Sequence, residues 1–252
     1  MSNREDSTRL FSTAHAGPVA VLVPAAGTGR RMGGPRKQFR QLGGRPLLVQ
    51  TLLVFERHPE VDRIVVAVPP GAVVSLEATL RGAGVHKLQA VVPGGGTRQA
   101  SVGAALQALP DDVAIVLVHD AVRPFVRRED VSRVLDHVRR HGAAALALPV
   151  SDTLRYGLEG FFGETVPREG LFRMQTPQGF RRDWFEEAHA AARRDGVQAT
   201  DDVELVQRLG HAVAIVPGSE QNVKLTTAGD WEWARRFWPQ WAAEIPEEAA
   251  GR

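Results

Sequence analysis

The feature that most constrains this fold is the regular alternation of short apolar runs with segments of helical periodicity. The apolar runs lie at residues 19–23, 63–68, 87–92, 114–118, 143–150 and 212–216. Apolar residues recur at helical spacing over 46–57, 73–81, 97–109, 129–141, 181–194, 202–209 and 228–238. Strands that are apolar on both faces, each followed by a helix, predict a mostly parallel sheet sandwiched by helices. We therefore expect a Rossmann-like α/β fold that binds its ligand at the carboxyl ends of the strands.

Residues 151–178 interrupt this alternation. They contain short strand-like pieces and several glycines typical of turns, but no helical period. We expect a β-arm that leaves the main body of the protein. Phe161 and Phe162 would be exposed on such an arm, and a second copy of the chain is the partner we expect to cover them. The sequence therefore predicts a homodimer joined through the arm.

Composition excludes several classes of protein. The chain has 252 residues, 43% of them hydrophobic, a net charge of only +2 and no cysteine. Without cysteine there are no disulfides, thiolate nucleophiles or cysteine-bound metals. No basic stripe with interleaved aromatic residues indicates nucleic-acid binding, and no apolar run approaches the ~20 residues of a membrane span. The polar start lacks the apolar core of a secretion signal, so we expect a cytoplasmic protein.

A glycine-rich, cationic segment follows the first apolar run. Its sequence over residues 24–39 is PAAGTGRRMGGPRKQF, and it contains four cations: Arg30, Arg31, Arg36 and Lys37. Small residues let backbone N–H groups approach a ligand closely, and clustered cations favour a polyanion. The segment matches neither the P-loop nor the dinucleotide motif. It predicts a phosphate-binding loop of another kind.

Two further motifs follow predicted strands and should converge on the same edge of the sheet. In PGGGTRQAS (93–101), three glycines precede a helix start at which Thr97 is a plausible N-cap. In HDAVRPF (119–125), Asp120 could bind Mg²⁺ through a triphosphate or orient a substrate hydroxyl. Arg123 supplies a forked donor suited to phosphate.

The order of the motifs is more specific than any one of them. PAAGTGRRM, KQF, GGGTR with Ser101, HDAVRPF, QTPQGF, TDDVELV and NVKLTT follow one another between residues 24 and 227. In that order they closely resemble the 2-C-methyl-D-erythritol 4-phosphate cytidylyltransferase family of the non-mevalonate isoprenoid pathway. The resemblance implies a nucleotidyltransferase fold and transfer of CMP from CTP to methylerythritol phosphate, with release of pyrophosphate. It also implies Mg²⁺ and a homodimer whose β-arms interlock.

The resemblance also assigns roles to residues at the matching positions. Those implied to contact CTP are Ala25, Ala26, Gly27, Gly95 and Ser101. Those implied to be catalytic, by holding the phosphates during transfer, are Arg31, Lys37 and Lys224.

The substrate side of the site is implied in the same way. Asp120 and Arg123 would contact the sugar phosphate, and Asp120 is also the implied metal ligand. Arg168 and Thr176 would reach the substrate's phosphate from the partner subunit.

Three questions stay open at this point. The family usually reads Pro-Lys-Gln where this chain has PRKQF, so Arg36 could share the role of Lys37. Ribitol-5-phosphate cytidylyltransferase shares the fold and chemistry and is the nearest alternative, and a non-catalytic nucleotide-binding regulatory module is an alternative of another class.

For the domain organisation we expect a disordered leader at 1–17, one nucleotidyltransferase domain at 18–240 and a flexible tail at 241–252.

Overall fold

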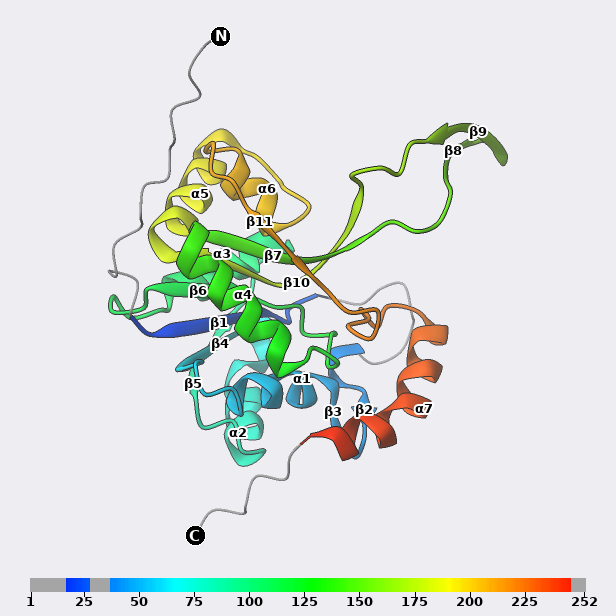
Figure 1. The fold of residues 1–252 in the computed structure, drawn as a ribbon. Helices are drawn as coiled ribbons and strands as arrows, with labels where there is room; N and C mark the ends of the chain where they lie inside the picture. The colour runs from blue at the N-terminus through cyan, green and yellow to red at the C-terminus, as the bar shows by residue number, and fades with distance from the viewer. Residues whose placement is uncertain (1–16, 28–36, 246–252) are drawn as a thin grey trace.

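A seven-stranded sheet with helices on both faces forms the body of the protein (Figure 1). The structure is a computed structural model, and it describes residues 17–27 and 37–245. The strands of the sheet are β1 (Val19–Pro24), β4 (Arg63–Val68), β5 (Leu88–Pro93), β6 (Ile115–Val118), β7 (Ala143–Pro149), β10 (Phe172–Arg181) and β11 (Ala214–Pro217). In the order β11-β7-β10-β6-β1-β4-β5, every pair of neighbours is parallel except the two that include β10. The predicted mostly parallel α/β fold is confirmed.

Two groups of helices cover the two faces of the sheet. The helices are α1 (Leu47–Glu56), α2 (Val73–Gly82), α3 (Arg98–Gln107), α4 (Arg128–His141), α5 (Arg182–Asp195), α6 (Asp202–Gln207) and α7 (Ala228–Glu244). Apolar side chains of α1, α2 and α4 pack on one face, and those of α3, α5 and α6 pack on the other. No helix within 17–27 and 37–245 is long and apolar enough to cross a membrane.

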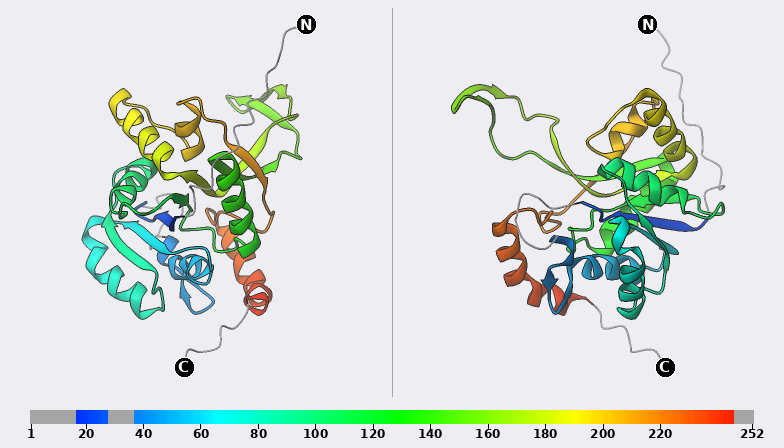
Figure 2. Two further views of the ribbon diagram at one scale, coloured as in Figure 1. Left: turned by 60° about the vertical axis from the view of Figure 1, so that its left-hand side comes forward. Right: turned by 180° about the vertical axis from the view of Figure 1, so that it is seen from behind.

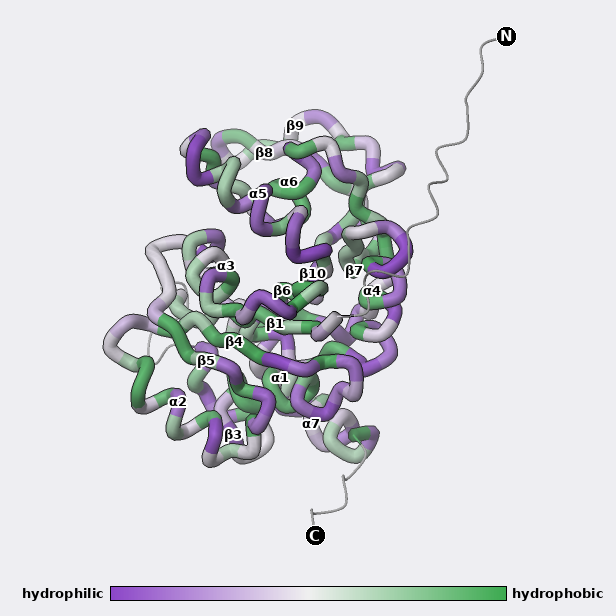
Figure 3. Tube along the Cα trace, turned by 90° about the vertical axis from the view of Figure 1, so that its left-hand side faces the viewer, coloured by the Kyte–Doolittle hydropathy of each residue, from purple (hydrophilic) through white to green (hydrophobic). Residues whose placement is uncertain are grey.

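Strand β1 shows why the alternation in the sequence produces this sandwich. Val19, Val21 and Val23 point into the core under α1 and α4, whereas Ala20 and Leu22 point into the core under α3 and α5. Because successive side chains of a strand point to opposite faces, a strand that is apolar throughout supplies both cores. Figure 3 shows the same pattern, with β1, β4 and β6 hydrophobic in the middle of the molecule.

The predicted arm is too long at its C-terminal end. Strand β10 enters the main sheet, where Gln178 pairs with Val118 of β6 and with Ala145 of β7. Its residues 175–180 are all buried. The prediction missed this strand because buried polar side chains, such as those of Gln175 and Thr176, do not give an apolar run.

A hairpin forms the tip of the arm. Strands β8 (Leu154–Leu158) and β9 (Phe161–Val166) pair with each other in antiparallel orientation and with no strand of the main sheet. Both views of Figure 2 show the hairpin extending away from the body. A separate hairpin of two strands has too small a core to be stable alone. The arm therefore needs another surface to pack against.

Helix α7 corrects the predicted start of the C-terminal tail. The helix runs to Glu244, and Trp241 is buried in a cluster with Phe125. An edge-to-face aromatic pair is favourable beyond the area it buries, so the chain stays helical past residue 240. Residues 241–244 are therefore not part of a flexible tail. The rest of the predicted tail, 246–252, and residues 1–16 of the predicted leader lie outside the described residues.

The contact between β10 and α4 predicts a stability effect at Gly179. A Cβ atom there would lie 2.7 Å from Val138, 2.8 Å from Leu117 and 2.9 Å from Val134. We expect Gly179→Ala to lower the free energy of unfolding by about 1–3 kcal/mol, because overpacking forces the neighbours apart. Urea denaturation measures this.

The matched control is Gly82→Ala at the end of α2, where no atom lies within 4 Å of the added Cβ. This variant should be neutral or slightly stabilising, since alanine reduces the entropy of the unfolded chain. Equal stability of the two variants would contradict the packing described for β10.

Candidate active site

Asp120 lies two residues beyond the end of β6, at the carboxyl edge of the sheet, and three cations surround its side chain. Its Oδ2 atom lies 2.9 Å from Lys224 Nζ and 3.3 Å from Arg123 Nε, and its Oδ1 atom lies 3.2 Å from Arg98 Nε. The carboxylate is almost fully buried. Burial disfavours its ionisation, but Arg98, Lys224 and Arg123 outweigh this and hold the pKa of Asp120 well below its usual range. A carboxylate with these partners is ionised and holds the three cations in place.

Arg98 connects Asp120 to a second carboxylate. Its Nη1 atom lies 2.5 Å from Oδ2 of Asp202, the first residue of α6. Burial raises the pKa of Asp202, and Arg98 opposes that rise. Asp202 Oδ1 has no hydrogen-bond partner among the described residues and faces His189 Nε2 at 3.9 Å. Arg98 thus bridges the ends of α3, β6 and α6.

A buried histidine fixes the backbone beside Asp120. The carbonyl of Arg123 lies 2.9 Å from His119 Nε2 and can only accept a hydrogen bond, so this nitrogen carries the proton. Nδ1 then accepts from the hydroxyl of Thr176 at 3.1 Å, and that hydroxyl accepts from the N–H of Asp120 at 3.0 Å. Burial lowers the pKa of His119 to about 4. A neutral His119 therefore fixes the backbone around Asp120 through these hydrogen bonds and is not a proton carrier.

The loop after β11 is held to the same cluster. Arg123 Nη1 donates to the carbonyl of Asn222 at 2.6 Å, and the Asn222 side-chain amide donates to the carbonyl of Thr176 at 2.9 Å. The N–H of Leu225 donates to the carbonyl of Val122 at 2.9 Å. These bonds on both sides of Lys224 direct its ammonium group to Asp120.

The small-residue loop after β1 approaches the glycine loop before α3. A Cβ atom on Gly94 would lie 2.4 Å from Cβ of Ala26, so only glycine permits this approach. Ala25 is held by its N–H, which donates to Ala67 O at 2.7 Å, and by its carbonyl, which accepts from Gln38 Nε2 at 2.6 Å. The same amide of Gln38 donates to the carbonyl of Gly27 at 3.1 Å. The two loops form one surface at the carboxyl edge.

The glycine loop itself is closed by the start of α3. Thr97 is the N-cap, as predicted, and its side chain accepts from the N–H of Ala100. The hydroxyl of Ser101 is buried and donates to the carbonyl of Thr97 at 2.9 Å. A Cβ atom on Gly95 would lie 2.5 Å from Cβ of Ala100. Ser101 therefore holds the loop, and its hydrogen atom is already used within the protein.

The structure brings most of the predicted site residues to one place. Those at the carboxyl edge are Ala25, Ala26, Gly27, Gly95, Ser101, Asp120, Arg123, Thr176 and Lys224. Lys37 belongs to the short 3-10 helix η2 (Lys37–Phe39), next to Gln38. Arg31 and Arg36 lie outside the described residues, so their positions stay predictions.

Thr176 of the QTPQGF motif and Arg168 of the VPREG motif, which were predicted to act together, lie in different parts of the structure. Thr176 is wrongly predicted to reach over from a partner, because β10 buries it beside His119 and Asp120 of its own chain. Arg168 is exposed on the arm, where its guanidinium donates to the carbonyl of Ser151. Its role at a partner's site stays a prediction.

The sequence reasoning did not select Arg98, Asp202 or Gln38 as site residues. All three lie within the motifs GGGTR, TDDVELV and KQF. Arg98 and Asp202 are 104 positions apart, so no local spacing reveals their ion pair. The only sign of these three residues in the sequence was that each is a charged or polar residue inside one of the motifs.

The described residues do not fit a metal held by the protein alone. No group of three or more His, Asp or Glu side chains within 17–27 and 37–245 is arranged to hold a metal ion. Both oxygens of Asp120 already accept hydrogen bonds or ion pairs from cations. A further cation at Asp120 would face three positive charges, so binding of a metal ion there is unfavourable.

A small-residue loop and a cluster of cations at the carboxyl edge of a doubly wound sheet define an α/β protein built to bind a polyanionic ligand. The family model described as 2-C-methyl-D-erythritol 4-phosphate cytidylyltransferase matches residues 19–238. The chain therefore belongs to the 2-C-methyl-D-erythritol 4-phosphate cytidylyltransferase family.

Relatives match nearly the whole chain. A 2-C-methyl-D-erythritol 4-phosphate cytidylyltransferase of Salinibacter ruber is 56% identical over 229 residues, which are 91% of this chain and 96% of the relative. The protein of the same name from Thermus thermophilus is 46% identical over 225 residues, or 89% of this chain and 99% of the relative. The resemblance drawn from the motifs is confirmed.

Solved structures agree in fold. The crystal structure of the Thermus thermophilus enzyme has a TM-score of 0.74 at 41% identity, covering 88% of this chain and 99% of that one. The 4-diphosphocytidyl-2C-methyl-D-erythritol synthase of Anaerococcus prevotii has a TM-score of 0.77 at 26% identity, covering 88% and 96%. The mixed sheet and its helices are therefore a shared architecture.

The neutral state of His119 predicts how stability depends on pH. The pKa of His119 is about 4 in the folded protein against an ordinary value of 6.5, so between these values the unfolded chain binds one more proton. The contribution of His119 to the free energy of unfolding is therefore fully present above pH 6.5. It falls as the pH decreases towards 4, by about 1.4 kcal/mol per pH unit at most. Buried His189, with its pKa also lowered to about 4, adds to the fall.

Urea denaturation at pH values from 4.5 to 7 tests this. The variant His119→Gln can keep the bond to Arg123 and should show a flatter pH dependence, whereas His86→Gln on the surface controls for the loss of one histidine. Identical slopes for wild type and His119→Gln would rule out the buried neutral histidine.

Proposed function

We propose that this protein transfers the cytidylyl group of CTP to 2-C-methyl-D-erythritol 4-phosphate, giving 4-diphosphocytidyl-2-C-methyl-D-erythritol and pyrophosphate. The observation that carries the proposal is the cluster of Arg98, Arg123 and Lys224 around Asp120, beside the small-residue loop after β1. This cluster lies within the residues that match the family model. The family model and the relatives favour methylerythritol phosphate over ribitol 5-phosphate.

The reaction needs orientation and charge neutralisation more than proton transfer. A phosphate oxygen of methylerythritol phosphate forms a bond to the α-phosphorus of CTP. The bond from that phosphorus to the oxygen bridging to the β-phosphorus breaks, and pyrophosphate leaves with the electron pair. The attacking oxygen is already anionic at neutral pH, so no general base is required. This agrees with His119, which lies at the site but is neutral and fully bonded within the protein.

Each part of the site has a role in this proposal. Ala25, Ala26 and Gly27 lie against the nucleotide, where small residues permit close backbone contact. Lys224 contacts the phosphate that is being joined, because its ammonium group is exposed on one side and paired with Asp120 on the other.

Of the remaining site residues, some bind the nucleotide and one orients the sugar phosphate. Lys37 and Arg31 hold the triphosphate, and Gly95 with the loop that Ser101 closes recognises the cytosine. Arg123 orients the sugar phosphate through its position beside Asp120. Preorganised donors of this kind cost no reorganisation at the moment of reaction.

Mg²⁺ is expected from the resemblance, and the donor set limits how it can bind. Oxygen atoms are its preferred ligands, and it usually reaches proteins together with substrate phosphates. Since three cationic side chains already contact the Asp120 carboxylate, the triphosphate would have to supply most of the ligands of Mg²⁺.

A cytoplasmic location also stays a prediction from the sequence.

We also propose that the active protein is a homodimer formed through the arm. On the hairpin, Leu158 is 78%, Phe161 80% and Phe162 87% exposed. Apolar side chains concentrated on one protruding hairpin indicate a protein interface. A second copy of the chain can bury both hairpins at once, and it would bring Arg168 to a partner's substrate site.

Pyrophosphate release tests the proposed activity. With CTP and Mg²⁺, the protein should release pyrophosphate when methylerythritol phosphate is added, with kcat/KM at least about tenfold higher than for ribitol 5-phosphate. Lys224→Ala is the matched negative control. Failure with both sugar phosphates by a folded protein would favour a non-catalytic nucleotide-binding module, and a preference for ribitol phosphate would favour the other cytidylyltransferase.

Mixing two inactive variants tests the role of the arm. Arg168→Ala and Lys224→Ala should each lower kcat by about 10²–10³, as expected for the loss of a preorganised donor. If Arg168 acts at the partner's site, a hybrid dimer of the two variants contains one intact site and activity returns on mixing. Each variant mixed with itself is the control. Absence of recovery in hybrid dimers verified by native mass spectrometry would show that each site is built within one chain.

A further inference from the structure

Lys224 lies in a part of the chain that has no regular structure. Residues 218–227, between β11 and α7, belong to no helix or strand. The ammonium group of Lys224 is 2.9 Å from Asp120 Oδ2, although 44% of the lysine side chain is exposed. A lysine has a long, flexible stem, so its ammonium group keeps one position only if its backbone is fixed on both sides. The buried side chain of Asn222 fixes the backbone before Lys224.

One carboxylate oxygen holds the backbone that leads from Lys224 into α7. Asp230, in the first turn of the helix, accepts at Oδ2 from the N–H of Thr226 and from the N–H of Thr227, each at 2.7 Å. The same oxygen accepts from the hydroxyl of Thr226 at 3.1 Å. In return, the N–H of Asp230 donates to the hydroxyl oxygen of Thr227 at 3.1 Å, which completes a capping box. The side chain of Asp230 therefore holds two consecutive residues of the Lys224 loop.

The charge of Asp230 strengthens this contact. Burial raises its pKa, but the hydrogen bonds from Thr226 and Thr227 outweigh this and hold the pKa of Asp230 below its usual value. The carboxylate is therefore ionised at neutral pH. Hydrogen bonds to an ionised acceptor are roughly twice as strong as those between neutral groups. Asp230 thus holds the loop more firmly than a neutral cap would.

The turn that carries this carboxylate is itself anchored on the body of the protein. Trp231, the next residue of α7, is buried in a cluster with Leu47 and Leu225. The guanidinium group of Arg40 lies over the indole ring, 5.9 Å from its centroid. Lys37 and Trp231 line the same small pocket. The first turn of α7 therefore contacts the segments of both lysines that we assign to the phosphates.

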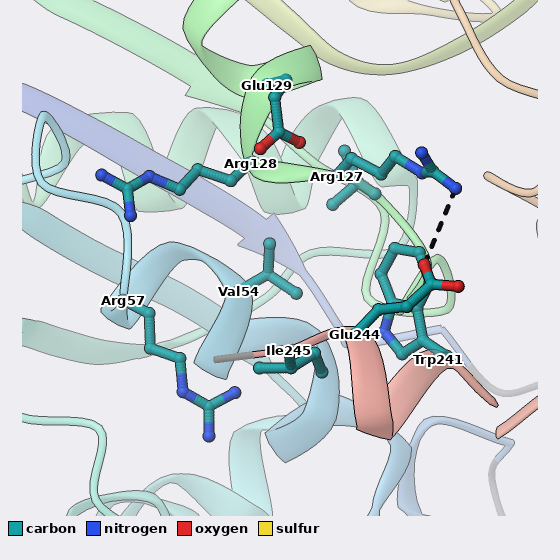
Figure 4. Close-up of a pocket in the computed structure, with 9 residues that line it drawn as sticks. Val54, Arg57, Arg127, Arg128, Glu129, Trp241, Glu244 and Ile245 are labelled. Atoms are coloured by element: carbon teal, nitrogen blue, oxygen red, sulfur yellow. Dashed lines mark ion pairs between the residues drawn. The ribbon is translucent and has the colours of Figure 1, made fainter. Parts of the chain in front are cut away.

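The other end of α7 is fixed to the segment that carries Asp120. Figure 4 shows the ion pair of Arg127 with Glu244 beside Trp241, and the two charged groups are 3.8 Å apart. The ring of Trp241 packs edge-to-face on that of Phe125, with centroids 5.5 Å apart. Phe125 and Arg127 lie between β6 and α4, in the same stretch as Asp120. Helix α7 therefore ties the Lys224 loop, through its first turn, to the stretch that holds the partner of Lys224.

We propose that Asp230 is a positioning residue for the transfer reaction. Its carboxylate fixes the backbone at Thr226 and Thr227, and the fixed backbone keeps the ammonium group of Lys224 beside Asp120, where it meets the phosphate that is being joined. The inference rests on the role proposed above for Lys224. A displacement of about 1 Å in a group that orients the reactants can lower the rate about 10²-fold, so a residue outside the site can control the reaction in this way.

A double-variant cycle measures whether Asp230 acts through Lys224. Asp230→Ala should lower kcat for pyrophosphate release at least tenfold. In the background of Lys224→Ala, the same change should lower kcat less than twofold, because the group that Asp230 positions is already missing. The same factor in both backgrounds would show that Asp230 only supports the fold and would overturn the proposal.

Thr227→Ala is the matched control. It removes the other half of the same capping box, the acceptor for the N–H of Asp230, and leaves the bonds of the Asp230 carboxylate to the loop in place. We expect a lower Tm, as for the loss of any N-cap side chain, and a kcat within about twofold of the wild type. An equal loss of kcat in Thr227→Ala and Asp230→Ala would also overturn the proposal.

Acylation of the lysines gives a readout that does not depend on activity. The chain has only three lysines, Lys37, Lys87 and Lys224, so N-acetoxysuccinimide labelling followed by peptide mass spectrometry resolves each of them. The amine of Lys224 must leave Asp120 before it reacts. Lys87 precedes β5 at the opposite edge of the sheet and is the internal reference. The rate at Lys224 relative to Lys87 should rise at least threefold in Asp230→Ala and stay unchanged in Thr227→Ala.

An unchanged relative rate in Asp230→Ala would overturn the proposal. If Asp230→Ala does not fold, Asp230→Asn takes its place, because an amide oxygen is a weaker acceptor than a carboxylate. It should raise the relative rate at Lys224 at least twofold, and a wild-type rate would overturn the proposal in the same way. If the wild type releases no pyrophosphate, the proposed function fails, whereas the acylation rates still decide whether Asp230 holds Lys224.

Discussion

The buried carboxylate of Asp120 is the interaction on which the rest of the site depends. A charged group this deeply buried is tolerated only when it is paired, and leaving it unpaired would cost several kcal/mol. Its three partners come from separate parts of the chain: Arg98 from α3, Arg123 from the loop after β6 and Lys224 from the loop after β11. Folding that satisfies Asp120 therefore assembles the cations of the site.

The position of β10 makes this assembly possible. In a purely parallel sheet, β6 would have a parallel neighbour on this side, but here β10 lies between β6 and β7 in the opposite direction. Because of that reversal, Thr176 lies next to the end of β6 and bonds both His119 and Asp120. The same strand leads out to the arm, so the site and the proposed dimer contact are parts of one continuous element.

The sequence predicted what local patterns can encode. Apolar runs and helical periods located the sheet and its helices, since burial on two faces leaves a clear signal in strands such as β1. Strand β10 was missed because Gln175 and Gln178 are buried polar residues whose hydrogen bonds are made to distant segments, as between Gln178 and Asp201. The pairing of Arg98 with Asp202 was missed for the same reason, because an ion pair between distant segments exists only after the fold has formed.

The charge balance of the cluster shows what its carboxylates do. Three cations placed together without a counter-charge would repel one another and spread apart, whereas the ionised carboxylate of Asp120 neutralises part of their charge and holds them at fixed positions. A net positive site that is already ordered can bind phosphate groups without first rearranging its own dipoles. On this argument Asp120 acts mainly as an anchor for cations. That accounts for its burial and its full set of cationic partners better than the role of a metal ligand predicted from the sequence.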